Sequence, residues 1–254
     1  MVVSLSSVEY IRQRLSPTPG DPFYLHLADL LQFISQVLPE RSVSVLDYGA
    51  GGSPYRTLFR SSTYDRADLP ADVSNGAPPD IALAACARLP QELAEYDVVL
   101  STQVLEHVEE PLIYLTECQR ALKPGGRLIL TTHGIFEDHP CPLDLQRWTA
   151  DGLVRLVSAA GFVNITCYAL TTGPRAVLFL LERQLHRFPT GVRSVARDFA
   201  ALPFRMLVKL GARRLQLFAD RTFAANRVAN ADDESPSFYI ALGIVAHKSA
   251  PGET

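Results

Sequence analysis

The sequence predicts an α/β fold built on a doubly wound, mostly parallel sheet. The first observation is the stretch Ser42–Phe59, where an apolar run stops at Asp47 and breaks directly into Gly49, Gly51 and Gly52. This order predicts a buried strand, a tight turn and a helix. The second observation is that later apolar segments alternate between strand-like and helical spacing, which is typical of strands joined by helical crossovers.

The elements follow one another along the chain with clear boundaries. A helix is predicted from Phe23 to Leu38, because its leucines recur at helical spacing and Pro39 ends the pattern. A second strand is predicted to end near Asp68, and helices are expected around 112–122 and 149–160. The remaining predicted strands are Asp97–Ser101, Arg127–Thr132, Asn164–Leu170 and Phe238–Lys248.

Length and composition limit the classes of protein that fit. A chain of 254 residues with 47% hydrophobic residues accommodates one large α/β domain with an elaboration. Four dispersed cysteines without a C-x-x-C pair predict neither a zinc site nor a disulfide framework, so a cytoplasmic location is expected. No secretory or membrane-spanning segment is expected, because the apolar runs are too short. The net charge of −3 gives no reason to expect a nucleic acid partner.

The glycine turn has to be distinguished from a dinucleotide-binding turn. Counted from Gly49, the third glycine position of G-x-G-x-x-G is occupied by Pro54. Asp47 would repel a diphosphate, but its carboxylate suits a ligand that carries an ammonium group and no phosphate, such as S-adenosylmethionine. A nicotinamide-dependent oxidoreductase is further disfavoured because the sequence lacks a Tyr-x-x-x-Lys pair.

Four stretches in order resemble class I S-adenosylmethionine-dependent methyltransferases of the type 11 methyltransferase domain. VLDYGAGGSPY resembles motif I, and PDIALAACARLP, YDVVLSTQVLEHVEEP and LKPGGRLILTT follow within Arg41–Thr166. The resemblance implies a Rossmann-like sheet of seven strands. It also implies that the last strand is antiparallel and lies between the fifth and sixth, after a helical insertion. S-adenosylmethionine would be the cofactor.

This resemblance, together with the composition along the chain, suggests three regions. Residues 1–40 form an N-terminal helical segment, residues 41–172 and 236–248 form the methyltransferase domain, and residues 173–235 form a helical insertion or cap. Residues 175–221 contain ten Lys or Arg against three acids, so this segment carries +7 and the rest carries −10. The insertion is expected either to contact an anionic membrane or lipid-linked acceptor, or to pack as an ordinary amphipathic helix on its own domain.

The resemblance assigns the cofactor side residue by residue. Asp47 and the backbone of the glycine turn are expected to hold the methionine portion, and Asp68, with Asp65 as the alternative, the ribose hydroxyls. The aspartate that the family uses for adenine falls on Ala85, which leaves the backbone near this position for adenine recognition. The other expected cofactor contacts are Gly49, Ala50, Gly51, Cys86, Ser101, Thr102 and Gln103.

The acceptor side is expected in Thr132–Thr149, after the fifth strand. His133 is the leading candidate for the general base and His139 the second, because a histidine can accept a proton at neutral pH. Adjacent acids that would orient the base are Glu137, Asp138 and Asp144. His133, His139 and Asp144 match no regular ligand spacing, so no metal is expected.

Part of this loop resembles a His-x-x-Pro-x-Asp-x-x-Arg-[Trp/Phe/Tyr]-Thr pattern found in part of the family. Asp144, Arg147 and Trp148 are therefore candidates for binding the acceptor, although a buried salt bridge and a packed indole explain the same residues. His107 recurs in the family's helix-opening turn and is a further candidate for the acceptor side, with a structural role favoured over a catalytic one.

The sequence thus predicts an S-adenosylmethionine-dependent methyltransferase acting on a small molecule. The expected acceptor is a hydroxyl on a sugar, a glycan precursor or a natural product; the oligomeric state stays open. A non-catalytic protein that binds S-adenosylmethionine as a regulatory or partner-binding module is the alternative, kept open by Ala85. A nicotinamide-dependent oxidoreductase is the weaker alternative.

Overall fold

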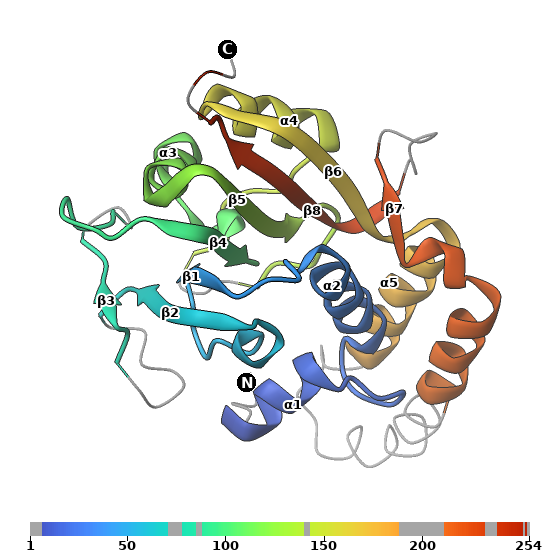
Figure 1. The fold of residues 1–254 in the computed structure, drawn as a ribbon. Helices are drawn as coiled ribbons and strands as arrows, with labels where there is room; N and C mark the ends of the chain where they lie inside the picture. Colours follow the sequence, from blue (N-terminus) through green and yellow to red (C-terminus); the bar gives the residue numbers. More distant parts are fainter. Residues whose placement is uncertain are drawn as a thin grey trace.

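A single sheet of eight strands organises the protein. The computed structural model describes residues 7–70, 78–84, 88–139, 143–187, 211–231, 238–250 and 252. The strand order is β3-β2-β1-β4-β5-β8-β6-β7 (Figure 1). The strands are β1 (Val43–Tyr48), β2 (Ser61–Asp68), β3 (Ile81–Ala82), β4 (Tyr96–Thr102), β5 (Leu122–His133), β6 (Phe162–Thr172), β7 (Val228–Asn230) and β8 (Tyr239–Lys248).

The sheet is parallel on one side and antiparallel on the other. Strands β1 to β5 pair in parallel, whereas β8 runs antiparallel to both β5 and β6. This confirms the predicted fold class and the place of the last strand. The predicted count of seven strands was wrong by one, because Val228–Asn230 pairs with Tyr168–Leu170 and adds β7 at the edge.

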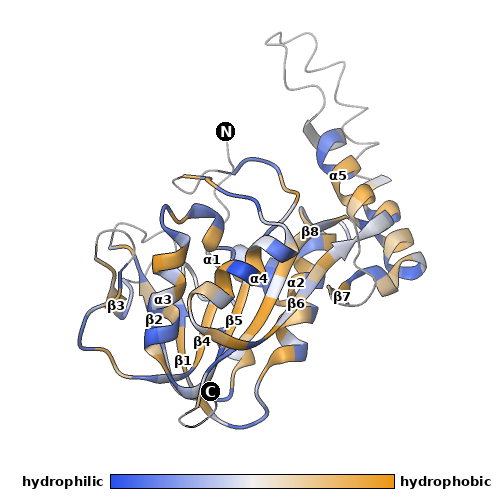
Figure 2. Cartoon of the chain, turned by 90° about the horizontal axis from the view of Figure 1, so that it is seen from above, coloured by the Kyte–Doolittle hydropathy of each residue, from blue (hydrophilic) through white to orange (hydrophobic). Residues whose placement is uncertain are grey.

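Helices cover both faces of the sheet. The helices are α1 (Ser7–Leu15), α2 (Tyr24–Val37), α3 (Pro111–Ala121), α4 (Ala150–Ala159) and α5 (Gly173–Arg187), with short 3-10 turns η1 (Arg56–Leu58), η3 (Leu105–His107) and η4 (Ala224–Asn226). The α2 helix packs on one face, and α3 and α4 contribute to the core on the other. The apolar colour in Figure 2 runs along the central strands between these layers.

The α2 helix lies close to the sheet because a glycine lies beneath it. Its buried residues include Leu30, Phe33 and Ile34, which share one face at helical spacing. A Cβ atom at Gly243 of β8 would lie 2.6 Å from the ring of Phe33. The absence of a side chain at this position therefore permits the contact between helix and strand.

The helix predicted after the glycine turn is not formed. The chain makes only the 3-10 turn η1 before β2 begins at Ser61. Pro54 cannot donate a backbone hydrogen bond, and the side chains of Tyr55 and Phe59 instead enter the core cluster under α2. The short connection to β2 leaves these two aromatic side chains to fill the space.

The stretch Lys123–Gly126 lies within the bounds of β5, which begins at Leu122 and not at the predicted Arg127. Leu122 pairs with Tyr96, and the next pair along β4 joins Arg127 to Val98. The residues between them bulge out of the ladder, and Gly125 adopts a φ of +73° there.

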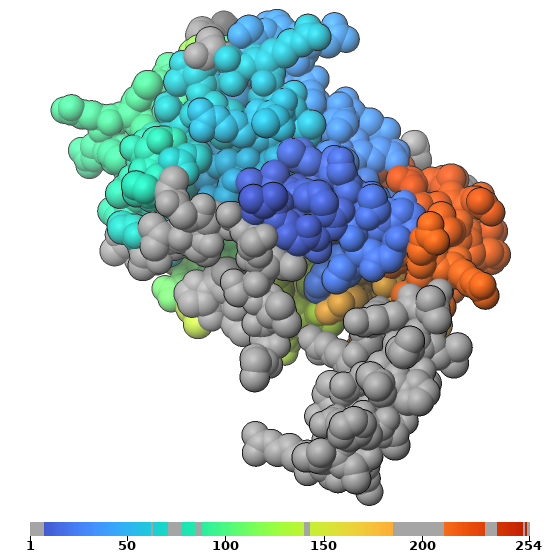
Figure 3. Space-filling view, turned by 90° about the horizontal axis from the view of Figure 1, so that it is seen from below, coloured from blue at the N-terminus to red at the C-terminus, as the bar shows by residue number. Residues whose placement is uncertain are grey.

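The described parts of the helical insertion pack against the N-terminal region. The α5 helix follows β6 directly, and a second helix occupies residues 211–222. In Figure 3 the orange part of the chain, which includes this second helix, lies beside the blue N-terminal residues. Residues 188–210 of the predicted cap lie outside the described residues, and the three-region division stays a prediction. Among the described helices, none has the length and apolarity required to cross a membrane.

Buried ion pairs hold the insertion in place. Arg175 of α5 is fully buried and donates to both carboxylate oxygens of Asp29 in α2, at 2.7 and 2.8 Å. Its third bond, of 2.8 Å, goes to Asp220. Part of the basic charge of the insertion is therefore neutralised inside the protein.

Candidate active site

The glycine turn lies between the carboxyl ends of β1, β2 and β4. Gly49 has a φ of +77°, and a Cβ atom there would lie 2.6 Å from Cγ2 of Val104. Gly51 has a φ of +48°. The N–H groups of Gly49 and Ala50 donate to the carbonyl oxygen of Ala67, at 2.8 and 3.2 Å. Only glycine fits the first position, and the turn is fixed to β2.

Asp68 lies directly on this turn. Its carboxylate accepts hydrogen bonds from the N–H of Gly51, at 2.6 Å, and from the N–H of Leu69, at 2.7 Å. Asp65, the alternative, instead accepts from the hydroxyl of Tyr96 at 2.7 Å. The position at the end of β2 and the contact with the glycine turn favour Asp68 over Asp65.

Asp47 lies beneath the turn. It is 3% exposed and accepts a hydrogen bond of 2.7 Å from the hydroxyl of Tyr64. Burial raises the pKa of Asp47 to about 7, and the hydrogen bonds from Tyr64 and Ser53 act in the opposite direction. The charge of this carboxyl is therefore sensitive to pH near neutrality and to any cation bound above it.

Two neighbouring residues at the end of β4, Ser101 and Thr102, differ in burial. Ser101 is fully buried, and its Oγ lies 2.8 Å from the hydroxyl of Tyr114, which donates to the carbonyl oxygen of Tyr48. Ser101 thus joins β1, β4 and α3 through hydrogen bonds, and its predicted contact with the cofactor stays a prediction. Thr102, by contrast, is partly exposed.

Gln103 is the strongest polar candidate at this strand end. Its backbone is left-handed, with a φ of +56°, and its N–H donates to the carbonyl oxygen of Thr131 at 2.9 Å. Both polar atoms of its side-chain amide are buried without a hydrogen-bond partner. A buried amide without partners is costly unless a ligand satisfies it. The glycine turn and Gln103 therefore fit the predicted cofactor. Ala85 and Cys86, the predicted adenine contacts, lie outside the described residues.

A cluster of histidines and one glutamate occupies the ends of β4 and β5. Nε2 of His133 lies 3.2 Å from Oε1 of Glu106, and Oε2 of Glu106 accepts a hydrogen bond of 2.8 Å from Thr132. The His133 ring stacks on Phe136 with centroids 3.9 Å apart, and the ring of His139 meets it edge-on at 4.7 Å. The cluster brings together both predicted base candidates.

Burial sets the charges of this cluster. Desolvation raises the pKa of Glu106 to about 7 and lowers the pKa of His133 well below its usual value. His133 is only 3% exposed, whereas the side chain of His139 is 33% exposed. The accessible member of the predicted pair is therefore His139.

Other predicted acceptor residues hold the loop itself. Arg147 donates to both oxygens of Asp144, each at 2.6 Å, and this pairing keeps the pKa of Asp144 well below its usual value. Asp144 also accepts from the N–H of His139 at 2.9 Å. Trp148 packs against the core, and its backbone N–H donates to the carbonyl oxygen of His133 at 3.0 Å. These contacts fit the structural alternative for the three residues, and their predicted contact with the acceptor stays a prediction.

His107 also has a structural contact. Its Nδ1 lies 2.5 Å from the carbonyl oxygen of Leu143, so this nitrogen carries the proton and donates. The backbone carbonyl of Glu106 accepts from the N–H groups of Leu145 and Gln146, at 2.9 and 3.2 Å. The turn after β4 thereby supports the loop after β5.

Glu106, Phe136 and His26 also belong to this site, and no sequence pattern predicted them there. Glu106 stands next to His107 in LEHVEEP, which was a usable signal, but its contact with His133 depends on β4 and β5 being neighbours. His26 comes from α2, and its ring centroid lies 5.5 Å from that of His133. Burial lowers the pKa of His26 to about 3, so its ring is neutral.

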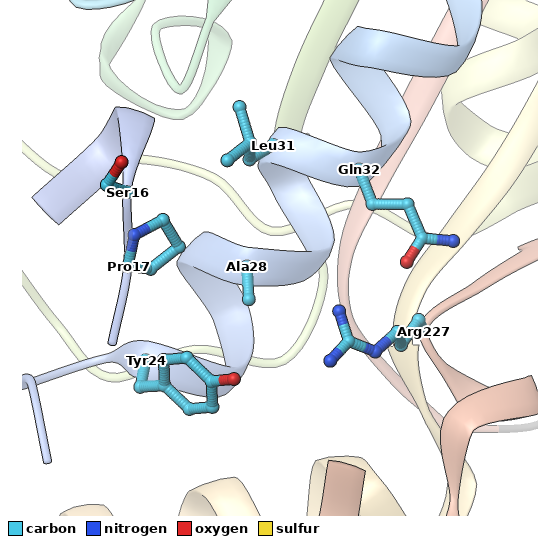
Figure 4. Close-up of a pocket in the computed structure, with 7 residues that line it drawn as sticks. All are labelled: Ser16, Pro17, Tyr24, Ala28, Leu31, Gln32 and Arg227. Carbon is cyan, nitrogen blue, oxygen red and sulfur yellow. The ribbon is translucent and has the colours of Figure 1, made fainter. Parts of the chain in front are cut away.

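A separate pocket lies on the surface between the N-terminal segment and α2. Its lining consists of Ser16, Pro17, Tyr24, Ala28, Leu31, Gln32 and Arg227 (Figure 4). Tyr24 donates to Asp220, and Arg227 donates to Asp220 at 2.6 Å, so two of its polar groups serve the packing of the insertion. None of the lining residues belongs to the glycine turn or to the histidine cluster.

Comparison with known proteins decides the family. A family model described as a methyltransferase domain matches residues 23–166, which is more than half of the chain. The chain belongs to the class I S-adenosylmethionine-dependent methyltransferase family. This confirms the predicted resemblance, and S-adenosylmethionine is the cofactor that the family uses.

Individual relatives cover less of the chain. A ubiquinone biosynthesis O-methyltransferase of Cereibacter sphaeroides is 30% identical over 118 residues, covering 39% of this chain and 44% of the relative. A probable S-adenosylmethionine-dependent methyltransferase of Mycobacterium tuberculosis is 33% identical over 102 residues, covering 38% of this chain and 37% of the relative. The chain thus spans less than half the length of these curated relatives.

The fold likeness extends further than the sequence likeness. The crystal structure of a possible histamine N-methyltransferase from Thermotoga maritima has a TM-score of 0.54 and 16% identity, and 95% of each chain is covered. At this identity the likeness concerns the fold alone. It confirms the Rossmann-like architecture.

Proposed function

We propose that the protein transfers a methyl group from S-adenosylmethionine to a hydroxyl of a small molecule. The acceptor class is a sugar, a glycan precursor or a natural product. The observation that carries this proposal is the side-by-side arrangement of a glycine turn, an unsatisfied Gln103 amide and the Glu106–His133–His139 cluster at the ends of adjacent strands. In open α/β sheets, ligands bind at the carboxyl ends of the strands.

The cofactor side uses three kinds of group. The backbone of Gly51 lets a ligand approach closely, because the space where a Cβ atom would lie is open, and Asp68 supplies a carboxylate for ribose hydroxyls. Asp47 supplies negative charge below the turn, which favours the ammonium group of the methionine portion. When bound, S-adenosylmethionine supplies the electrophilic methyl group.

The acceptor side must hold a hydroxyl in line with that methyl group and remove its proton. His139 is the accessible member of the cluster, and His133 and Glu106 lie behind it. General acid–base catalysis by groups positioned in this way increases the reaction rate by about 10²–10⁴-fold. An oxygen acceptor is further supported by the O-methyltransferase name of one relative.

Calorimetry and a methylation screen test this proposal. Titration with S-adenosylmethionine and S-adenosylhomocysteine should give saturable binding, and the nicotinamide dinucleotides should not bind. Transfer of a radioactive methyl group should then be screened over hydroxylated sugars, phenols and lipid-linked sugar phosphates. Binding of S-adenosylmethionine without transfer to any acceptor would favour the regulatory alternative, and binding of a nicotinamide dinucleotide would contradict the proposal.

We also propose that the helical insertion brings the site close to an anionic membrane or a lipid-linked acceptor. On the helix at 211–222, Arg213, Arg214 and Arg221 are exposed, and Phe218 is 52% exposed. Each basic residue near an anionic surface contributes at most about 1 kcal/mol. Binding to vesicles should rise with the fraction of anionic lipid and fall with added salt.

A paired variant sharpens this experiment. Arg213→Glu/Arg214→Glu should release the protein from anionic vesicles, whereas reversal of an exposed arginine elsewhere, Arg41→Glu, should have a much smaller effect. Absence of binding at low salt to strongly anionic vesicles would leave the insertion as a cap only.

A further inference from the structure

Three side chains of the acceptor-side cluster direct potential metal ligands at one another. One ligand atom from each of Glu106, His133 and His139 can be chosen so that all three atoms lie within 4.8 Å of one another. Glu106 comes from η3 after β4, His133 is the last residue of β5, and His139 follows in the next loop. The convergence results from the pairing of β4 with β5.

Several polar atoms of this cluster make no hydrogen bond. Oε1 of Glu106, Nδ1 of His133 and Nδ1 of His139 are buried and have no hydrogen-bond partner. Each buried polar atom without a partner costs about 1–3 kcal/mol. Of these atoms, Oε1 of Glu106 faces Nε2 of His133 and Nδ1 of His139 faces Asp144, so the buried oxygen of Glu106 is the atom for which a bound ion would supply a partner.

The spacing suits a small cation. Nε2 of His133 and Oε1 of Glu106 are 3.2 Å apart. Two ligand atoms that each lie about 2.0–2.1 Å from a tetrahedral zinc ion are separated by roughly 3.3 Å. The two buried ligands therefore need little movement to share one ion.

A carboxylate lies behind the third ligand. Oδ2 of Asp144 is 3.5 Å from Nδ1 of His139, and Asp144 is itself held by two bonds from Arg147. Metal-binding histidines usually present their other ring nitrogen to a carboxylate, which fixes the orientation of the ring. Asp144 would have this role, while Nε2 of His139 would face the ion.

We propose that Glu106, His133 and His139 form a binding site for one divalent transition-metal ion of the zinc class. Two histidines and one carboxylate are a ligand set of catalytic zinc sites, which keep a fourth position for water or substrate. The partly exposed ring of His139 leaves one side of the cluster accessible. Sequence spacing did not predict the site, because Glu106 replaces Asp144 as the third ligand.

The role of the ion rests on the proposed function. A hydroxyl that coordinates a divalent ion loses its proton at a lower pH than a free hydroxyl. The oxygen keeps the electron pair of its O–H bond, and the proton passes to solvent on the exposed side of His139. The ion would thus position the acceptor oxygen, and it would promote loss of the proton in place of His139, which would then be a ligand and not the base. Ion binding itself does not depend on this role.

Ion binding is measured on the full chain, without cofactor or acceptor. The protein is stripped with a chelator and titrated with Zn²⁺ by calorimetry, and the bound metal is counted by mass spectrometry. One ion per chain is expected, and Co²⁺ should give the visible absorption of a nitrogen- and oxygen-ligated site. Mg²⁺ should bind far more weakly, because imidazoles disfavour it.

Variants assign the ligands. His139→Ala and Glu106→Gln should each weaken Zn²⁺ binding by at least about tenfold, and Asp144→Asn by about 10–100-fold. The control is His247→Ala on β8, which removes a half-buried histidine away from the cluster and should bind like the wild type. Thermal unfolding of each metal-free variant checks its fold; if Glu106→Gln does not fold, the more exposed His139 provides the test.

The outcomes separate this inference from the proposed function. The metal site would be overturned if the protein bound no Zn²⁺, or if the wild type and His139→Ala bound Zn²⁺ with equal affinity. Full methyl transfer by the metal-free protein would overturn the role of the ion in the reaction and leave the methyltransferase proposal intact. Ion binding without any binding of S-adenosylmethionine would overturn the methyltransferase proposal alone.

Discussion

The carboxylate of Asp68 accepts a hydrogen bond of 2.6 Å from the backbone N–H of Gly51, and this bond joins the end of β2 to the glycine turn. It places one acidic side chain at the point where a ribose would lie over the turn. The same contact distinguishes Asp68 from Asp65, although the two residues are only three positions apart.

Replacement of Asp68 tests the ribose contact. Asp68→Ala should weaken S-adenosylmethionine binding by about 1.5–3 kcal/mol, the range for loss of a charge-assisted hydrogen bond. Calorimetry measures the change. Asp65→Ala is the matched control, because it removes a carboxylate from the same strand and breaks the bond from Tyr96. A larger effect of Asp65→Ala would mean that the ribose residue is assigned incorrectly.

The raised pKa of Asp47 predicts that cofactor binding depends on pH. Its carboxyl has a pKa of about 7 in the free protein and is largely neutral below that pH. A cationic ligand binds the ionised form more tightly, so affinity should increase from about pH 6 to about pH 7.5, below the range in which an amino group loses its own proton. Asp47→Asn should bind weakly and with no such dependence. An identical dependence of affinity on pH in both proteins would show that the charge of Asp47 does not affect cofactor binding.

Loss of His139 should affect turnover more than cofactor binding. His139→Ala removes the accessible member of the acceptor-side cluster, so kcat on a hydroxyl acceptor should fall by about 10²–10⁴. The Kd for S-adenosylmethionine should stay close to that of wild type. Steady-state kinetics and calorimetry together give both values. An unchanged kcat would show that His139 takes no part in the reaction, and the same experiment would then be made on His133.

The close approach of Gly49 to Val104 predicts a stability effect with two separable causes. Gly49→Ala combines a positive φ with a Cβ atom 2.6 Å from a methyl group of Val104, so it should lower the free energy of unfolding by about 1–3 kcal/mol. Gly125→Ala has a similar φ of +73° but open space around the new Cβ, and it isolates the backbone cost. Equal losses in the two variants, measured by urea unfolding, would exclude a steric contribution.

The buried pair between Arg175 and Asp29 should matter more than pairs on the surface. Arg175→Met leaves the fully buried carboxylate of Asp29 without its main partner and should cost about 3–5 kcal/mol. Adding Asp29→Asn should recover part of this loss, because the unpaired charge is then absent. Arg12→Met breaks partly exposed pairs with Glu9 and Asp21, and each of these pairs is worth at most about 1 kcal/mol.

Local patterns in the sequence predicted the elements that depend on local residues. The apolar periodicity of α2 and the strands that flank the glycine turn are confirmed. The missing helix after the turn could not be predicted from the glycines, because it depends on Tyr55 and Phe59 filling the core. The eighth strand was missed because a three-residue strand has no periodicity to detect.

The candidate site was predicted where it follows strand ends and missed where it depends on pairing between strands. Asp68 and Gln103 lie at the expected strand ends, and His133 and His139 are close together as expected. Glu106 joins them only because β4 lies beside β5, which a single motif does not reveal. Arg147 was expected near the acceptor, but its guanidinium is occupied by Asp144 and by backbone carbonyls of the same loop.

The position of β8 has a consequence for the order in which the protein assembles. This strand is made after the whole helical insertion, yet it pairs with β5 and β6, and its Ala241 lies opposite His133. During synthesis, β5 and β6 therefore present open strand edges until residues 239–248 have left the ribosome. His133, at the end of β5, is paired with Ala241 only after β8 has been made. The part of the sheet that carries the acceptor-side cluster is therefore completed after the insertion has been synthesised.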